Sequence, residues 1–121
     1  MPYQISWEQH GVYVQYHGTC TEIDVEEIRN ILSHDPRLAT ITYILNDYFA
    51  CDGFALSPAF IKELAKRTYH PVLASRILKI AFVTSIPEII AVASEYLQRS
   101  LSQHEYRVFQ DLTQACDWCR Q

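Results

Sequence analysis

The chain has 121 residues, of which 49% are hydrophobic and 20% are charged, with a formal net charge of -4. This length is typical of one domain, and so much apolar content against a modest charge excludes an intrinsically disordered chain. Acidic residues outnumber basic ones by 14 to 10, which argues against nucleic-acid binding because that function needs a basic surface. No apolar run approaches the roughly 18 residues of a membrane span.

The first part of the chain predicts two strands followed by a helix. Apolar and polar residues alternate over 3–8 and more regularly over 12–17, which is typical of strands with one buried face. Thr21 and Asp24 resemble a capping box, and apolar residues follow them at helical spacing, so a helix is predicted over 22–33. Asp35 and Pro36 are expected to end it.

The middle of the chain predicts a buried strand, a loop and a second helix. The β-branched and apolar residues of 40–45 favour a strand, and 46–56 is interpreted as a loop that carries aromatic residues. Ser57 and Pro58 suit an N-cap and a first helical position, so the helix is expected to begin there. Another buried strand is expected over 78–84.

The last part predicts a helix, a strand and a final helix. The first of these helices is expected to run to about Leu101, the strand over 106–109, and the final helix from its cap at Asp111. Strands that alternate with helices predict an α/β domain with a mostly parallel sheet and right-handed crossovers. The two strands at the start of the chain add an antiparallel edge hairpin.

The element order and several short segments resemble the STAS/SpoIIAA-like superfamily. The segments are GVYVQYHG (11–18), IAFV (80–83), YRVF (106–109) and the stretch RVFQDLTQACDW (107–118), which is similar to a "vF.dl.eAl.Wl" ending of that group. The resemblance implies a single domain over 1–121, with a four- to five-stranded sheet and about four helices packed on one side. It also implies a regulatory or ligand-binding module and not a catalyst.

The resemblance makes Ser57 a candidate phosphoacceptor. In the anti-sigma-factor antagonists of this superfamily, a serine at the start of the helix after the third strand is phosphorylated, within an Asp-Ser-Ser-Gly-like setting. Ser57 holds the nearest position, but it lies between Leu56 and Pro58, without the acidic neighbour and the glycine. The alternative interpretation is that Ser57 only caps its helix.

The segment 46–56 is the main candidate for a binding site. It follows the carboxyl end of a central parallel strand, where ligands of open α/β sheets tend to bind. Phe54 and Leu56 are expected to fold back into the core, which leaves the neighbouring aromatic residues to face outward. The predicted recognition residues are Tyr48, Phe49, Asp52 and Ser57.

Three functions therefore stay open. The first is a non-enzymatic module that binds a protein partner or a small amphipathic ligand, and the second is a switch phosphorylated at Ser57. The third is a small enzyme that uses Cys51, paired for example with His70, or the loop carboxylates Asp47 and Asp52. The alternative interpretation of Asp47 and Asp52 is that they are solvated turn residues.

The remaining cysteines and the last tryptophan are interpreted as packing residues. Cys116 and Cys119 match a Cys-x-x-Cys pattern, but both fall inside the final helix on its apolar face, which favours packing over redox chemistry or zinc. The Trp118 ring is expected to pack against the fold. No cofactor or metal is expected, and the chain is predicted to be a cytoplasmic monomer or homodimer with reduced thiols.

Overall fold

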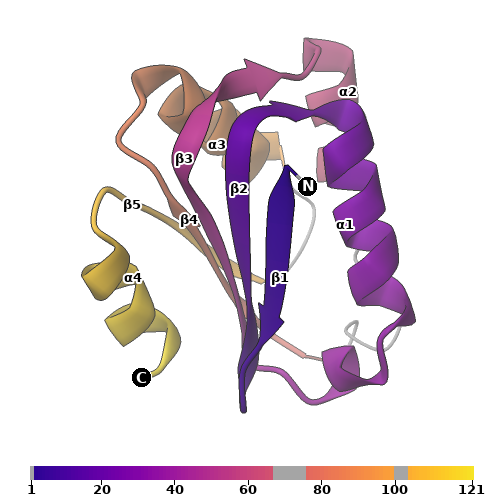
Figure 1. Cartoon of the computed structure of the whole chain (residues 1–121), viewed down its shortest axis with the longest axis vertical. Helices are drawn as coiled ribbons and strands as arrows, with labels where there is room; N and C mark the ends of the chain where they lie inside the picture. Colours follow the sequence, from indigo (N-terminus) through magenta and orange to yellow (C-terminus); the bar gives the residue numbers. More distant parts are fainter. Residues whose placement is uncertain (1, 67–75, 100–103) are drawn as a thin grey trace.

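The sheet contains five strands that follow one another in sequence order across it (Figure 1). The computed structural model describes residues 2–66, 76–99 and 104–121. The strands are β1 (Tyr3–Trp7), β2 (Gly11–Thr21), β3 (Tyr43–Ala55), β4 (Lys79–Val83) and β5 (Glu105–Phe109). β1 pairs antiparallel with β2, and every later pair is parallel. The predicted mostly parallel sheet with an antiparallel edge hairpin is confirmed.

Four α-helices and one short 3-10 helix accompany the strands in the described residues. They are α1 (Glu22–His34), η1 (Pro36–Ala39), α2 (Pro58–Ala65), α3 (Pro87–Arg99) and α4 (Leu112–Cys119). The capping box of α1 is confirmed, because the Asp24 N–H donates to Thr21 Oγ1 at 3.3 Å and the Thr21 N–H donates to Asp24 Oδ2 at 3.0 Å. Ser57 and Asp111 are the N-caps of α2 and α4, as predicted. The expected end near Leu101 lies outside the described residues.

The helices cover both faces of the sheet, so the expectation of one-sided packing holds for α1, α2 and α3 but not for α4 (Figure 1). The first three helices each connect one parallel strand to the next, and the strands advance in one direction. Because such crossovers share one hand, all three helices fall on the same face. α4 follows the last strand and makes no crossover, so it is free to fold onto the opposite face.

The central strands supply a core to each face by alternation. Ile44 on β3 and Ile80 on β4 are buried beneath α1, α2 and α3. Their neighbours Leu45 and Ala81 point the other way and pack with Ala115 and Cys119 of α4. Because both faces are covered, these strands lack polar alternation, which is typical of buried parallel strands.

β3 is longer than expected, and this overturns the interpretation of 46–56 as a loop. The strand continues to Ala55, and beyond Asp47 it pairs only with β2, since its pairing with β4 stops there. Two register shifts between β2 and β3 insert extra residues into β3 in this part. Such bulges break the two-residue periodicity of a strand, which explains why the sequence pattern here does not alternate.

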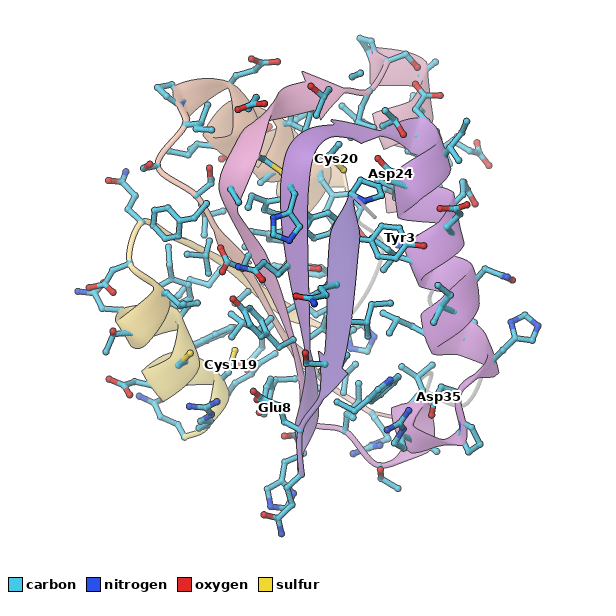
Figure 2. All side chains as sticks on the ribbon, in the orientation of Figure 1. Tyr3, Glu8, Cys20, Asp24, Asp35 and Cys119 are labelled. Atoms are coloured by element: carbon cyan, nitrogen blue, oxygen red, sulfur yellow. The ribbon has the colours of Figure 1, made fainter. Side chains whose placement is uncertain are left out.

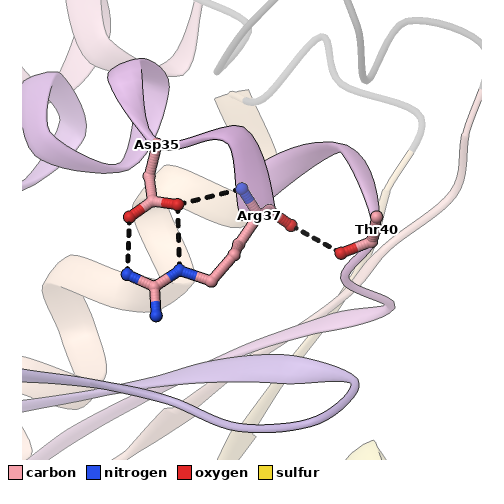
Figure 3. A network of polar contacts seen from close by, with 3 residues as sticks. All are labelled: Asp35, Arg37 and Thr40. Carbon is pink, nitrogen blue, oxygen red and sulfur yellow. Dashed lines mark hydrogen bonds and ion pairs between the residues drawn. The ribbon is translucent and has the colours of Figure 1, made fainter.

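Asp35 organises the connection from α1 to β3 (Figure 3). Its carboxylate accepts hydrogen bonds from the Arg37 backbone N–H at 2.9 Å, from Arg37 Nε at 3.0 Å and from Arg37 Nη2 at 2.7 Å. These bonds lower the pKa of Asp35. Thr40 Oγ1 donates to the Arg37 carbonyl at 3.0 Å, and the Arg37 guanidinium lies 4.6 Å from the Trp7 ring centroid. The predicted stop of the helix at Asp35 is confirmed, and the turn is anchored to β1.

Candidate binding site at the carboxyl edge of the sheet

The N-termini of three helices meet around the last residues of β3. The backbone N–H of Ser57, the N-cap of α2, donates to Oε2 of Glu22 in the first turn of α1 at 2.8 Å. On the other side, Gly53 lies against Glu88 of α3, because a Cβ at Gly53 would lie 3.3 Å from Glu88 Oε2. This edge, where parallel strands end and helices begin, is where ligands of open α/β sheets tend to bind.

Tyr48 and Phe49 face in opposite directions. The Tyr48 side chain is 7% exposed, whereas that of Phe49 is 45% exposed. The Tyr48 ring stacks on Tyr16, with 4.4 Å between ring centroids, and lies 5.1 Å from Phe54. Tyr48 and Phe49 lie at the first register shift between β2 and β3, and the backbone there directs the Tyr48 ring to the side of Tyr16 and Phe54. The expectation that Tyr48 is exposed is therefore wrong, and Phe49 alone presents its ring to solvent.

Asp47 is a buried residue, which corrects its interpretation as a solvated turn carboxylate. Its side chain is only 3% exposed. The Tyr13 hydroxyl donates to Asp47 Oδ2 at 2.5 Å, and the backbone N–H of Phe49 donates to Asp47 Oδ1 at 3.0 Å. Burial and the bond to Asp47 raise the pKa of Tyr13 well above its usual value. Asp47 thus holds the backbone at Phe49 in place.

Asp52 and Ser57 are exposed at this edge, as the recognition hypothesis requires. Asp52 lies at the second register shift of β3, between the residues that pair with Gly18 and Thr19. Ser57 Oγ accepts a hydrogen bond from the Phe60 N–H at 3.1 Å, so its capping role is confirmed. The structure thus brings Phe49, Asp52 and Ser57 to the surface along one stretch of chain, which we call the edge surface.

The Cys51 thiol is poorly suited to act as a nucleophile. It is buried, and burial, followed by the charge of Asp52, raises its pKa to about 11. Burial likewise raises the pKa of Cys20 to about 12. A thiolate is the reactive form, so both groups are in the unreactive state near neutral pH. His70, the imagined partner of Cys51, lies outside the described residues.

The cysteines of α4 pack against the sheet, as predicted. Cys119, labelled in Figure 2, is buried with Tyr43 and Leu45, and burial raises the pKa of its thiol to about 12. Cys116 is half-buried beside this cluster, and burial raises its pKa as well. The Trp118 ring packs on Phe109, with 5.6 Å between ring centroids. The prediction that Trp118 packs against the fold is also confirmed.

A thiol reagent should therefore label Cys119 much more slowly in the native protein than in urea, with Cys116 reacting somewhat faster than Cys119. The reason is that both accessibility and thiolate formation are suppressed by burial. Peptide mapping by mass spectrometry after timed labelling measures each site separately. Fast native labelling of both thiols would contradict the packing role and revive a redox function for the pair.

A cavity of about 70 Å³ lies between the sheet and the helices α1, α2 and α3. Its walls are mostly apolar or aromatic side chains, among them Tyr16, Tyr48, Phe54, Phe82, Val92 and Tyr96. The sequence analysis missed this cavity. Strands β2, β3, β4 and β5 each place one aromatic ring on this face of the sheet. The sequence could have indicated the cavity through these rings only if the register of the strands had been known. These rings are Tyr16, Tyr48, Phe82 and Tyr106.

Two features are absent from the described part of the chain. None of its helices is both long and apolar enough to cross a bilayer. Over 2–66, 76–99 and 104–121, no group of three or more His, Cys, Asp or Glu side chains is placed to hold a metal ion.

Comparison with known proteins identifies the fold. No protein-family model and no curated protein matches the chain, but solved structures match nearly its whole length. The unphosphorylated anti-sigma factor antagonist SpoIIAA is 14% identical, with 98% of this chain and 97% of that chain covered and a TM-score of 0.63. SpoIIAA of Bacillus in its phosphorylated form is 17% identical, with 96% and 97% covered and a TM-score of 0.55.

A third structure is an uncharacterized protein of the DUF3478 family, with a SpoIIAA-like fold, from Shewanella loihica PV-4. It is 18% identical, with 97% of this chain and 91% of that chain covered and a TM-score of 0.57. The chain therefore has a SpoIIAA-like fold, and the resemblance noted from the strand sequences is confirmed at the level of the fold.

Proposed function

We propose that the protein is a non-enzymatic regulatory module, one domain over 1–121, that recognises a protein partner through the edge surface. The observation that carries the proposal is the Phe49 ring, which is 45% exposed although the same strand buries most of its other large side chains. Aromatic residues are enriched at protein interfaces relative to the rest of the surface. The proposal places the protein in the cytoplasm as a monomer or homodimer.

The Phe49 ring is presented on a rigid backbone. Phe49 lies at the first register shift between β2 and β3, and bulges of this kind commonly re-aim a side chain next to a functional site. The buried Asp47 carboxylate accepts the Phe49 N–H, and the Tyr13 hydroxyl holds that carboxylate in turn. A preformed anchor loses little conformational entropy on binding, which favours recognition of a partner.

Asp52 and Ser57 supply the polar part of the same surface. Interfaces combine a large apolar anchor with polar groups at the rim, and these two exposed side chains follow Phe49 within one stretch of chain. SpoIIAA, whose fold this chain shares, is by name an antagonist of a protein factor. That likeness supports a protein as the partner of this chain too.

Replacing Phe49 by serine should abolish capture of the partner that the wild-type protein retains from extract of its source organism. The free energy of unfolding should change by less than about 1 kcal/mol, because surface substitutions cost little. Ile31→Ser is the matched control, since Ile31 is also an exposed apolar residue, 41% exposed, but lies on α1. Capture that survives Phe49→Ser and is lost in Ile31→Ser would place the site on α1 instead.

A phosphorylation switch at Ser57 is the second candidate, supported by its exposed hydroxyl at the start of α2. A helix N-terminus favours a phosphate group, and a solved structure of SpoIIAA is in a phosphorylated form. A phosphate on Ser57 would compete with the Glu22 carboxylate for the Ser57 N–H, which would loosen the contact between α1 and α2. Phosphate found on Ser57 by mass spectrometry after incubation with extract and ATP supports this candidate, and its absence argues against it.

A further inference from the structure

We propose that the protein forms a homodimer in which β1 pairs antiparallel with β1 of a second copy, so that the two sheets join into one across a two-fold axis. Among the strands of the described residues, β1 and β5 are the two edges of the sheet (Figure 1). An edge strand offers a row of backbone groups to another strand. The inference does not rest on the edge surface, because Phe49, Asp52 and Ser57 belong to β3 and the start of α2.

The hydrogen bonds of β1 show which of its residues turn their backbone outward. The Glu8 N–H donates to the Gly11 carbonyl at 2.8 Å, so the Glu8 backbone faces β2. Hydrogen-bonded residues alternate along an antiparallel strand, and the register between β1 and β2 has no shift. The even-numbered residues of β1 therefore direct their backbone groups to β2, and the odd-numbered residues direct theirs away from the sheet. We call the outward N–H and C=O groups of Tyr3, Ile5 and Trp7 the open edge.

β1 lacks the features by which edge strands avoid pairing with one another. Its residues 3–7 include no charged side chain and no proline, and no bulge interrupts its register. At the opposite edge of the sheet, β5 carries Glu105 and Arg107. A second β5 centred antiparallel on Arg107 would place two guanidinium groups opposite each other, and like charges in that position are destabilising. Of the two edges, β1 is therefore the one suited to pair with a copy of itself.

β1 is held in place within the single chain. The Tyr3 hydroxyl donates to Glu27 Oε1 of α1 at 3.2 Å, and Figure 2 shows Tyr3 directed toward that helix. The Arg37 guanidinium lies 4.6 Å from the Trp7 ring centroid. These contacts are made by side chains on one face of β1 and do not use the open edge. A strand that is already ordered loses little conformational entropy on pairing, which favours association.

The open edge is complementary to itself. With the two-fold axis at Ile5, Ile5 lies opposite Ile5 of the second copy and Tyr3 lies opposite Trp7 of the second copy, so all the outward backbone groups find partners. Ile5 and Trp7 are half-buried in the single chain, and pairing would bury more of both side chains. On the other face, Gln4 would lie opposite Ser6 of the second copy, which brings no like charges together. This symmetry favours a second copy as the occupant of the edge.

The dimer is tested with the full chain by sedimentation equilibrium, which should show a reversible monomer–dimer equilibrium between about 10 µM and 1 mM. Amide hydrogen exchange followed by NMR at both ends of that range locates the interface. The Tyr3, Ile5 and Trp7 amides should exchange at least about threefold more slowly in the concentrated sample, whereas the Ser6 amide, which faces β2, should not change. A chain that stays monomeric, or a dimer in which those three amides do not slow, would overturn the proposal.

Two double variants test the antiparallel register. Gln4→Lys with Ser6→Lys places two pairs of like charges across the interface, whereas Gln4→Lys with Ser6→Glu places two pairs of opposite charges there. Both positions are exposed, so both variants should fold. The dissociation constant of the dimer should be at least about fivefold higher for the first variant than for the second. This order is expected although the first variant adds two positive charges to a chain of net charge -4 and so lowers its overall repulsion.

The control variant is Phe49→Ser, which alters the edge surface and should leave the dissociation constant of the dimer unchanged. The dimer and the proposed function can therefore fail separately. Equal dissociation constants for the two double variants would contradict pairing through β1.

Discussion

Replacing Tyr48 by alanine is expected to lower the free energy of unfolding by about 3–5 kcal/mol, as large-to-small substitutions of buried aromatic residues do. The ring is 7% exposed and contacts rings on three strands, with 4.4 Å to Tyr16, 5.1 Å to Phe54 and 6.2 Å to Phe82 between centroids. Its loss would enlarge the cavity and remove these contacts together. Urea unfolding followed by far-UV circular dichroism measures the change.

The matched control is Tyr48→Phe, which keeps the ring and removes only the hydroxyl. It should cost far less than Tyr48→Ala, since the ring supplies most of the packing. The contrast with Phe49 is equally informative, because the next residue along the strand is expected to be nearly neutral for stability. A cost of less than about 1 kcal/mol for Tyr48→Ala would show that the ring is not part of the core.

Replacing Trp118 by alanine is expected to lower the free energy of unfolding by about 3 kcal/mol. The indole ring packs on Phe109 and lies beneath two cations, with Lys79 Nζ at 5.5 Å and the Arg107 guanidinium at 5.4 Å from its centroid. Lys79 Nζ also donates to the Trp118 carbonyl at 3.0 Å. The ring therefore anchors α4 to β4 and β5. Thermal unfolding and urea titration of the variant and the wild-type protein measure the decrease in the free energy of unfolding.

A chain that ends at Asp111 tests the same helix as a whole. Without α4, Tyr43, Leu45 and Ala81 on the second face of the sheet would lose their cover, so the truncated chain should melt well below the full-length protein. Trp118→Phe is the conservative control and should retain much of the stability. A truncated chain that melts at the full-length temperature would show that α4 is not part of the core.

The regular elements of this fold could be predicted from the sequence because their signals are local. The capping box of Thr21 and Asp24, the Ser57-Pro58 helix start and the Asp111 cap each depend on residues a few positions apart. Four helices and a parallel sheet with an edge hairpin follow from the alternation of these elements. The resemblance to SpoIIAA-like proteins led to the same fold.

The features that were missed depend on contacts between distant residues. β3 carries two bulges against β2, and a bulge is a property of the pair of strands, so 46–56 gave no strand pattern of its own. The wrong prediction that the Tyr48 ring faces outward followed from that error. The face on which α4 packs is set by the apolar side chains of β3 and β4 that the other helices do not cover, and no spacing within α4 reveals this. Asp47 was misread for the same reason, since its partner Tyr13 is 34 residues away.

The candidate site was therefore predicted in part. Phe49, Asp52 and Ser57 lie at the surface, as the sequence analysis expected, although Phe49 and Asp52 belong to β3 itself and only Ser57 follows its end. Tyr48 belongs to the cavity instead. Tyr48 and Phe49 are neighbours on one strand and both are aromatic. The residue types alone therefore could not predict which ring lines the cavity and which is exposed.

The most direct test of the central claim is photo-crosslinking from the edge surface. A benzophenone amino acid is placed at Phe49 in one protein and at Ile31, the matched exposed position on α1, in another. Irradiation in extract of the source organism should join a protein partner to the chain from position 49 and not from position 31. The same adduct from position 31, with none from position 49, would contradict recognition through the edge surface.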